Sequence, residues 1–566
     1  TLCMIMPSCK KCQASFEIQP DEQAFLQKIV FTYGNTKISP PEPVYCPDCR
    51  MQIRTSHRNE RTFYKTKSAK SGNPLVSLYK DEPAWGKPYT IYDQEEWRGN
   101  DFDGLTYGKD FDFNRSFFEQ FADLAKEVPR MNMITVNNEN SDYTTGTGYC
   151  RNSYLINSSE NCEDCYHGKL MQTCKDSMDC SYLYDSQLCY ECFSVYKSYN
   201  CQYLLFSQNC NDCFFSSNLT GCKYCCLCTN LHQKEYHFEN KPLPKEKWER
   251  RVSEFKGSHK KIQEMRQKML TARTAAPQKY ANIVNPQNCT GDYIENSKNC
   301  IDCYDVNESE DCRYVQVGVK VKDNYDCSNM YLKPELCYES LGTIEDFNIA
   351  YCIFVFNSTN LLYCDYCFHC DDCFGCSGLT RKKHCIFNKQ YTEEEYNALV
   401  PKIIERMKQD GEWGLFFPVK FSPFGYNETL AYEYLPLTKE EATAQGFLWR
   451  DDIDQVPNVE KIIPADRLPD SIDDIPEDIL NWAIKCERTQ RPFQIVKQEL
   501  AFYKRNKLPI PHFHPDVRHE ERMKLRNPRK LYKRQCGKCQ KEVQSTYSEE
   551  RTEKILCEEC YLKEVY

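Results

Sequence analysis

The chain has 566 residues, a formal net charge of −9 and 37 cysteines. Its length suffices for three or more domains. It contains neither a run of about 18 apolar residues nor a signal-peptide pattern, so we expect no contact with a membrane. Secreted disulfide scaffolds are usually shorter, and paired Cys-x-x-Cys sequences favour thiolates that bind metal in a reducing compartment. The sequence therefore predicts a cytoplasmic protein.

Positive charge is concentrated in two short segments of this acidic chain. Residues 50–70 carry seven basic and one acidic side chain, and residues 518–541 carry ten and two, so the remainder has a net charge of −23. Such a concentration is typical of a nucleic-acid contact on an otherwise soluble body.

The first module, residues 1–100, contains a pair of ribbon-like units. The first unit has two Cys-x-x-Cys knuckles, which supply four soft thiolates for a tetrahedral zinc ion. These ligands are Cys9, Cys12, Cys46 and Cys49. The second unit has Ser68, Ser71, Tyr92 and Glu95 at the corresponding positions. We expect the first unit to hold zinc and the second to be degenerate.

The last module, residues 481–566, repeats this pair with the opposite losses. In its first unit the ligand positions hold Cys486, Thr489, His514 and Val517, so this unit has lost a complete set. Its second unit is complete, with Cys536, Cys539, Cys557 and Cys560. The chain is therefore expected to bind about two zinc ions.

A second internal duplication lies between these modules. Cysteines recur at steps of twelve residues in both copies, residues 150–240 and 286–390, with Asn, Asp, Ser and Tyr between them. Examples are Cys150, Cys162 and Cys174 in the first copy, and Cys352, Cys364 and Cys376 in the second. A fixed short period predicts stacked rungs, hence two Cys-rich β-solenoids. The expected fold class is mainly β with helices: a duplicated β-solenoid with twelve-residue rungs, flanked by zinc-ribbon modules at both ends.

The cysteines of the repeats have three possible roles. Regular repetition favours small side chains packed in a narrow interior as free thiols. Binding of metal or an iron–sulfur cluster is the second role, and ladders of disulfides are the third.

The remaining segments connect these parts. Residues 101–149 are expected to be a helical connector, with a helix at 112–128. Residues 241–285 have the pattern of an amphipathic helix, whose apolar face would comprise Trp248, Val252, Phe255, Ile262, Met265 and Met269. Residues 391–410 are expected to be a helix and residues 411–480 an extended linker or strap.

Two arginine stripes follow the knuckle positions of the two modules. The arginines Arg50, Arg54, Arg58 and Arg61 match Arg518, Arg522, Arg526 and Arg529. Steps of four, four and three residues place each set on one side of a helix. We expect the stripes to bind RNA phosphates, because arginine contacts phosphate with two donors. Further RNA contacts would come from Lys65, Lys530, Lys533 and Arg534, with Tyr64 and Tyr532 stacking on bases. The alternative is that the stripes pair with the acidic body of the same chain or with a partner protein.

Known sequence signatures of enzymes are absent, so the leading hypothesis is a non-enzymatic RNA-binding protein, plausibly associated with the ribosome. The second hypothesis is a structural or assembly scaffold that self-associates or docks partner proteins. The third is a thiol-rich metal store.

The string Cys-Pro-Asp-Cys-Arg at residues 46–50, the Cys-rich rungs and the basic segment after His514 together resemble a family of uncharacterised zinc-ribbon, Cys-rich-repeat proteins from candidate-phylum, ultra-small bacteria. The resemblance covers nearly the whole chain. It implies a bacterial cytosolic protein and brings no established activity.

Overall fold

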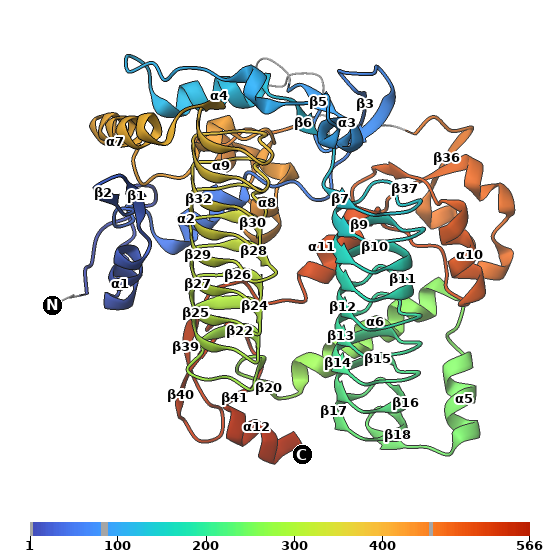
Figure 1. Cartoon of the computed structure of the whole chain (residues 1–566). Helices are drawn as coiled ribbons and strands as arrows, with labels where there is room; N and C mark the ends of the chain where they lie inside the picture. Colours follow the sequence, from blue (N-terminus) through green and yellow to red (C-terminus); the bar gives the residue numbers. More distant parts are fainter. Residues whose placement is uncertain (1–3, 81–88, 452–456, 566) are drawn as a thin grey trace.

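The structure is a computed structural model that describes residues 4–80, 89–451 and 457–565. Two columns of short parallel strands, here called stack 1 and stack 2, stand side by side with helices and small sheets around them (Figure 1). The chain follows the two columns in opposite directions, as the colours of Figure 1 show. The prediction of a mainly β protein with helices is confirmed.

Stack 1 begins earlier than expected, before residue 150. Its strands are β7 (Thr135–Val136), β8 (Thr145–Gly148), β9 (Tyr154–Glu160), β10 (Glu163–Gln172), β11 (Lys175–Met178), β12 (Ser181–Tyr184), β13 (Phe193–Tyr196), β14 (Gln202–Gln208), β15 (Phe214–Thr220), β16 (Lys223–Cys226), β17 (Thr229–His232), β18 (Glu235–Phe238) and β19 (Lys241–Pro242).

Stack 2 consists of two sheets. The first contains β21 (Ile283–Val284), β22 (Gly291–Glu295), β24 (Cys303–Asn307), β26 (Gln316–Val319), β28 (Ser328–Tyr331) and β30 (Leu341–Ile344). The second contains β23 (Lys298–Ile301), β25 (Glu310–Arg313), β27 (Lys322–Tyr325), β29 (Glu335–Tyr338), β31 (Phe347–Ala350), β32 (Thr359–Leu362), β33 (Asp371–Phe374), β34 (Lys383–Ile386) and β35 (Lys389–Gln390).

Neighbouring rungs are in register at a step of twelve residues, as the sequence predicts. Cys165 lies beside Ser177 in stack 1, and Cys373 lies beside Cys385 in stack 2. In stack 2, β21 and β22 pair at a step of eleven residues, whereas β27 with β29 and β28 with β30 pair at a step of thirteen, one residue more than the usual step. This extra residue falls where two consecutive residues, Leu332 and Lys333, both have positive φ.

A three-residue period underlies the twelve-residue step. Every third residue from Asn137 to Glu239 has a positive φ, including Gly146 and Gly221, and the same holds from Tyr293 to Leu332. Such a conformation turns the chain and is tolerated best by Gly, Asn and Asp. Four turns in twelve residues give each rung four short sides.

The side chain after each turn points inward, where only small or compact residues fit. Cys174 is 2 % exposed, and its Sγ donates to the Gln172 carbonyl at 3.2 Å and lies 3.2 Å from the Leu183 carbonyl in the next rung. Ser177 makes the analogous bond to the Lys175 carbonyl at 2.9 Å. The Gln172 and Lys175 carbonyls also accept backbone N–H groups of the next rung, so these bonds chiefly satisfy the buried thiol and hydroxyl donors.

The last rung of each stack ends in the same way. The Asn240 side chain accepts from Thr229 N at 2.8 Å and donates to Thr229 O at 2.9 Å. Asn388 repeats both bonds on Ser377, at 2.9 and 2.6 Å. Each asparagine therefore takes the place of a further rung, and the chain then reverses into an antiparallel strand, β19 or β35. An open strand edge, which invites aggregation, is thereby removed.

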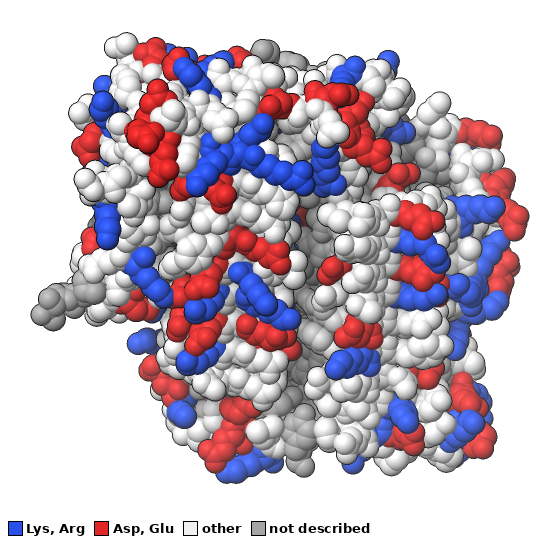
Figure 2. Space-filling model, in the orientation of Figure 1, with Lys and Arg blue, Asp and Glu red and all other residues white. Residues whose placement is uncertain are grey.

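Charged side chains on the outside of the rungs form ladders of alternating sign. Glu163 lies between Arg151 and Lys175 at 2.7 and 3.2 Å, and Lys298 pairs with Glu310 at 2.7 Å. Figure 2 shows that acidic and basic residues intermingle over the visible faces of both stacks.

The two end modules share part of their order of elements, which supports the duplication. The first has α1 (Pro20–Lys28), β1 (Phe31–Tyr33), β2 (Thr36–Ile38), α2 (Pro47–Thr55), β3 (Tyr64–Lys67), β4 (Pro74–Ser77), β5 (Ile91–Tyr92) and α3 (Gln94–Arg98). The last has β37 (Trp482–Lys485), β38 (Pro492–Phe493), α10 (Lys497–Arg505), α11 (Pro515–Met523), β39 (Tyr532–Gln535), β40 (Glu542–Ser545), β41 (Ile555–Leu556) and α12 (Glu558–Val565). The order is the same from α2 and from α11 onward, but it differs before that point: β1 and β2 follow α1, whereas β37 and β38 precede α10.

The connecting segments complete the fold. They contain η1 (Gly104–Tyr107), α4 (Phe117–Glu127), β6 (Arg130–Met131), α5 (Lys245–Ser253), α6 (His259–Ala275), β20 (Gln278–Lys279), α7 (Glu393–Gln409), η2 (Val419–Phe421), η3 (Tyr426–Glu428), α8 (Leu430–Tyr434), α9 (Lys439–Ala444), β36 (Lys461–Pro464), η4 (Ala465–Arg467), η5 (Ile472–Asp474) and η6 (Glu477–Asn481). The predicted apolar face at residues 248–269 is buried on stack 1.

Two expectations about these connections need correction. Residues 241–285 hold two helices rather than one, because the chain turns at Gly257, whose φ is +80°. Residues 411–480 are not simply an extended strap, since Phe417, Tyr426 and Ile472 are buried in three hydrophobic clusters. Among the described residues, no helix is long and apolar enough to cross a membrane.

Candidate metal centres and arginine clamps

The first candidate metal centre lies where a tight turn meets the start of α2. Cys9 and Cys12 flank the turn, Cys46 caps α2, and Cys49 follows in its first turn. The four sulfurs lie within 4.8 Å of one another, and those of Cys12 and Cys46 are 3.7 Å apart. A tetrahedral ion about 2.3 Å from each sulfur would separate them by about 3.8 Å, so the set fits such an ion.

The neighbouring thiols of this centre hydrogen-bond to one another, so their pKa values move apart. A hydrogen bond from Cys49, opposed by burial, lowers the pKa of the Cys46 thiol to about 5. Lys11 lies beside the four sulfurs and donates to the Gln52 side chain at 2.5 Å. The hydrogen bond with Cys46 raises the pKa of the Cys49 thiol. Because deprotonated sulfur is the form that binds metal, binding of an ion would release protons from this set.

The second candidate centre, at the other end of the chain, has the same construction. Its ligands are Cys536, Cys539, Cys557 and Cys560, whose sulfurs also lie within 4.8 Å of one another. Burial opposes ionisation of Cys536, but backbone N–H groups of Cys539 and Cys557 outweigh it and lower its pKa to about 6. The Cys539 and Cys557 sulfurs are 3.7 Å apart. Both predicted four-cysteine sets are therefore groups that could hold metal ions.

The two degenerate units lack the four-cysteine set but keep the turn, which is held by hydrogen bonds. Gly72, Gln490, Gln13 and Gln540 all have φ between 60° and 76° and close equivalent turns. In one degenerate unit Ser68 donates to Glu96, so Glu96 rather than Glu95 reaches the ligand position. In the other, Thr489 bonds the Cys486 thiol. Among the described residues, neither unit gathers three groups of the types that bind metal.

Three arginines of the first stripe, Arg50, Arg54 and Arg58, are buried, so their predicted contacts with RNA are wrong. Arg50 and Arg54 are 2 % and 0 % exposed, because α2 packs its arginine face on stack 2. Arg50 pairs with Asp326 at 2.8 Å, and Arg54 pairs with Glu339 at 3.0 Å. Arg54 also donates to Ser328 and Gln316 at 3.2 and 3.3 Å.

The second stripe makes the matching contact with stack 1. Arg518 pairs with Asp179, and Arg522 pairs with Asp179 at 3.1 Å and with Glu191 at 3.4 Å. Burial alone would raise the pKa of Asp179, but the two guanidinium groups hold it below its usual range. Arg522 is 1 % exposed. Neither arginine is therefore available to an RNA phosphate.

The later arginines of each stripe reach the opposite stack. Arg526 and Arg529 both pair with Asp305 of stack 2, at 2.9 and 2.8 Å. Arg58 pairs with Glu60 at 2.6 Å and donates to Ser158 of stack 1 at 3.3 Å. Each segment thus starts on one stack and ends on the other, and we call the two segments, residues 50–61 and 518–529, the arginine clamps.

The clamps contact duplicated carboxylates that sequence reasoning missed. Asp179 and Glu191 occupy successive rungs of stack 1, and Asp326 and Glu339 occupy successive rungs of stack 2. All four have positive φ and stand directly before an inward-pointing Cys or Ser. That placement is visible in the sequence once the three-residue period is recognised.

The other predicted RNA contacts divide between paired and exposed groups. Arg61 pairs with Asp516 at 3.2 Å, and Arg534 donates to the Tyr547 carbonyl at 3.3 Å. Tyr64 is 3 % exposed and bonds Glu428, so it cannot stack on a base. Lys65, Lys530 and Lys533 are exposed and Tyr532 is half-buried. The predicted contacts do not form one surface.

A buried charge network joins the two clamps at the centre of the molecule. Lys169 of stack 1 is 2 % exposed and pairs with Glu433 of α8 and, at 3.2 Å, with Glu60. Glu433 in turn lies 2.8 Å from Nε2 of His519 in α11. Burial opposes the charge on Glu60, yet Lys169 and Arg58 lower its pKa to about 2.

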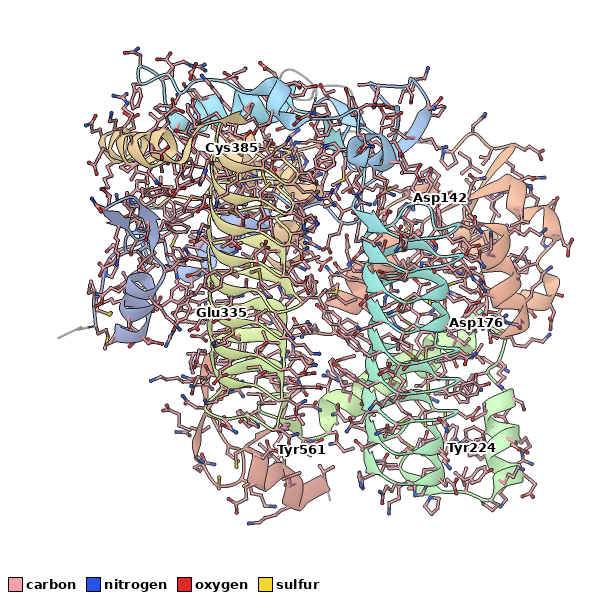
Figure 3. The ribbon with its side chains drawn as sticks, in the orientation of Figure 1. Asp142, Asp176, Tyr224, Glu335, Cys385 and Tyr561 are labelled. Atoms are coloured by element: carbon pink, nitrogen blue, oxygen red, sulfur yellow. The ribbon has the colours of Figure 1, made fainter. Side chains whose placement is uncertain are left out.

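The ends of the stacks are also tied together. The Tyr561 hydroxyl of the second ribbon donates to Asn230 of stack 1 at 3.2 Å, while Ser545 and Thr546 bond Tyr280 and Asp292 beside the start of stack 2. Figure 3 shows Tyr561 and Tyr224 at the same end of the molecule.

Most other cysteines line the interiors of the stacks as free thiols. Among the described residues, only the two four-cysteine sets bring three or more metal-binding groups together. Free, closely packed thiols favour the packing role over clusters and over disulfide ladders.

Comparisons of this chain with models of protein families, with curated proteins and with solved structures find no match. The resemblance to ribbon proteins of ultra-small bacteria stays a prediction.

Proposed function

We propose that this protein is a non-enzymatic, zinc-stabilised scaffold in which two β-solenoids are held as one rigid body for docking partner proteins. The observation that carries this proposal is the pair of buried arginine clamps, each of which spans both stacks. Arginines that could have bound an external partner are used to fix the relative position of the stacks.

The solenoid interpretation is supported by the parallel register and the four-sided rungs. Each rung pairs with the next along the length of each stack. The Cys and Ser side chains that point inward fill the interior and leave no room there for a ligand. Such repeats offer extended, regular outer faces, which solenoid proteins use for binding.

Zinc is the metal that fits the two four-cysteine sets best. Four thiolates at tetrahedral spacing suit Zn²⁺, which needs neither a redox change nor oxygen ligands. The first ion would fix the start of a clamp, because Cys49 directly precedes Arg50 in α2. The second ion would fix the ribbon that covers the start of stack 2, because Cys557 directly follows β41, which pairs with β20.

Docking of partner proteins is favoured over self-association through the basic segments. The acidic sites that the basic segments would contact on a neighbour are already filled within the same chain. RNA binding, ribosome association and a cytoplasmic location stay predictions, and RNA would require cations outside the clamps.

The proposal can be tested by loosening one clamp. Arg518→Met with Arg522→Met should leave Asp179 unpaired, let the stacks move apart, and increase the radius of gyration measured by small-angle X-ray scattering. Arg151→Met with Lys175→Met is the matched control, because it removes two exposed arginine or lysine side chains from a stack. If the scattering of the clamp variant equals that of the control while circular dichroism shows both folded, the rigid-scaffold proposal is wrong.

A further inference from the structure

Residues 241–279 are the most basic part of the chain outside the clamps. They carry twelve basic and four acidic side chains, a net charge of +8, in a chain whose total is −9. Unlike the clamp arginines, most of these cations are exposed. The segment contains α5, which stands along the side of stack 1 that faces away from stack 2, and α6, which crosses stack 1 toward stack 2 (Figure 1).

The apolar face of this helix pair is already occupied. Trp248 and Val252 of α5 and Ile262, Met265 and Met269 of α6 are each at most 8 % exposed, in one core with stack 1. Because the apolar face is packed in the core, the basic face of the two helices is exposed to solvent. No residue of this segment is among the exposed large hydrophobic side chains of the described chain.

Several cations on this face lack an acidic partner. Among the described residues, no carboxylate lies within 4.0 Å of the charged groups of Lys241, Lys247, Arg250, Lys260 or Lys268. On the stacks, some exposed lysines stand in ladders, as Lys298 does with Glu310, while others such as Lys197 and Lys333 stand singly among the described residues. The helices differ from the rest of the surface in that five such cations are grouped within residues 241–268.

We infer that α5 and α6 form a binding track for the phosphate backbone of nucleic acid, RNA or DNA. At a rise of about 1.5 Å per residue, the 17 residues of α6 span about 25 Å and the 9 residues of α5 about 14 Å, so α6 alone is long enough for several successive phosphates. A membrane surface would require an exposed apolar face, which these helices bury in the core. The track reads charge and not sequence, because phosphate contacts carry no base information.

The test is fluorescence anisotropy of the full chain with labelled 20-nucleotide RNA and DNA over a salt series. The variant Lys247→Gln, Arg250→Gln, Lys260→Gln, Lys268→Gln should weaken binding at least tenfold near 0.1 M salt. It should also flatten the slope of log affinity against log salt by up to about 3, taking about 0.7 per lost phosphate contact on a single strand. RNA and DNA should be affected alike.

The matched control is Lys175→Gln, Lys298→Gln, Lys320→Gln, Lys322→Gln, which removes the same charge from paired ladders. This control should bind as the parent does. Equal weakening of both variants, absence of binding by the parent at 50 mM salt, or equal binding of the parent to phosphatidylserine vesicles would overturn the inference. Because all eight side chains are exposed, both variants should keep the parent's circular dichroism, and Lys247→Gln alone should already lower affinity.

Discussion

Arg54 shows what burial does to a charge that sequence alone places on a surface. It is fully enclosed, donates to three side chains, and neutralises Glu339, whose pKa burial raises to about 7. A buried charge of this kind is held by its partners, so its removal leaves a desolvated carboxylate and unpaired polar groups. Clamp residues should therefore be far more sensitive to substitution than exposed ladder residues.

Arg54→Met should lower the free energy of unfolding by about 3–5 kcal/mol, because Glu339, Ser328 and Gln316 lose a buried partner. Arg151→Met, at an exposed ladder, should cost less than about 1 kcal/mol. Urea denaturation compares the two. Equal costs would show that the clamp contributes no more than a surface ion pair, whereas adding Glu339→Gln to Arg54→Met should recover part of the loss.

Buried histidines should make the protein sensitive to acid. Burial lowers the pKa of His57 to about 4, so between pH 4 and 6.5 the unfolded chain binds one proton more than the folded chain at this position. Stability is therefore lost as the pH falls through this window, at about 1.4 kcal/mol per pH unit for each such proton.

His57→Gln should flatten the pH dependence of unfolding by about that amount between pH 4 and 6.5. His369→Gln, at an exposed position, serves as the control. The measurement is the denaturation midpoint at half-unit steps of pH. An unchanged slope in the His57 variant would show that this ring does not stay neutral in the folded state.

At the scale of the elements, the rungs are defined by turns rather than by strands. A left-handed residue every third position, Asn, Asp or Tyr in many places, makes each side too short for a regular strand and fixes which side chain points inward. The inward-pointing positions hold Cys, Ser, Leu or Val, depending on the space inside each rung. Cys and Ser alternate freely because both donate to the carbonyl two residues earlier.

Cys201→Leu should overpack its rung and destabilise the protein by roughly 1–3 kcal/mol, since the thiol is completely buried. Cys201→Ser should cost less, because a hydroxyl can keep the bond to the Tyr199 carbonyl that Sγ makes at 3.4 Å. Thermal unfolding followed by circular dichroism measures both. A larger loss for serine than for leucine would contradict the account of the interior.

At the scale of the whole molecule, two duplications interlock. Each end module sends one clamp across both stacks, and the second ribbon also covers the start of stack 2. A four-cysteine set that could hold a metal ion is kept in one unit of each pair, while the other unit holds the same turn by hydrogen bonds. The two ends therefore share a shape and differ in how it is stabilised.

Elemental analysis of the purified protein should find about two zinc ions per chain. Cys12→Ser and Cys539→Ser should each lower the content to about one, whereas Cys486→Ser should leave it at two. A zinc content near zero would show that the two four-cysteine sets do not hold metal. A large iron content would favour the thiol-rich store, because only the packed thiols of the stacks could bind it.

The sequence by itself determined the features that depend on local spacing. The two four-cysteine sets, the degenerate units, both duplications and the twelve-residue step all follow from residues close together in the chain or repeated along it. The three-residue period is equally local and was missed, because cysteines fill only some of the inward positions. The apolar face of α5 and α6 was also predictable, because its residues recur at helical spacing within one short segment.

Only the tertiary structure decided where the arginines point. A stripe on one side of a helix fits a phosphate backbone and a row of carboxylates equally well, and its partners, such as Glu339 for Arg54, lie hundreds of residues away. The packing of the two stacks brings those carboxylates to the stripes and excludes water from the pairs. Charge spacing is therefore a property of the sequence, whereas burial, which decides what the charge can bind, is a property of the assembled fold.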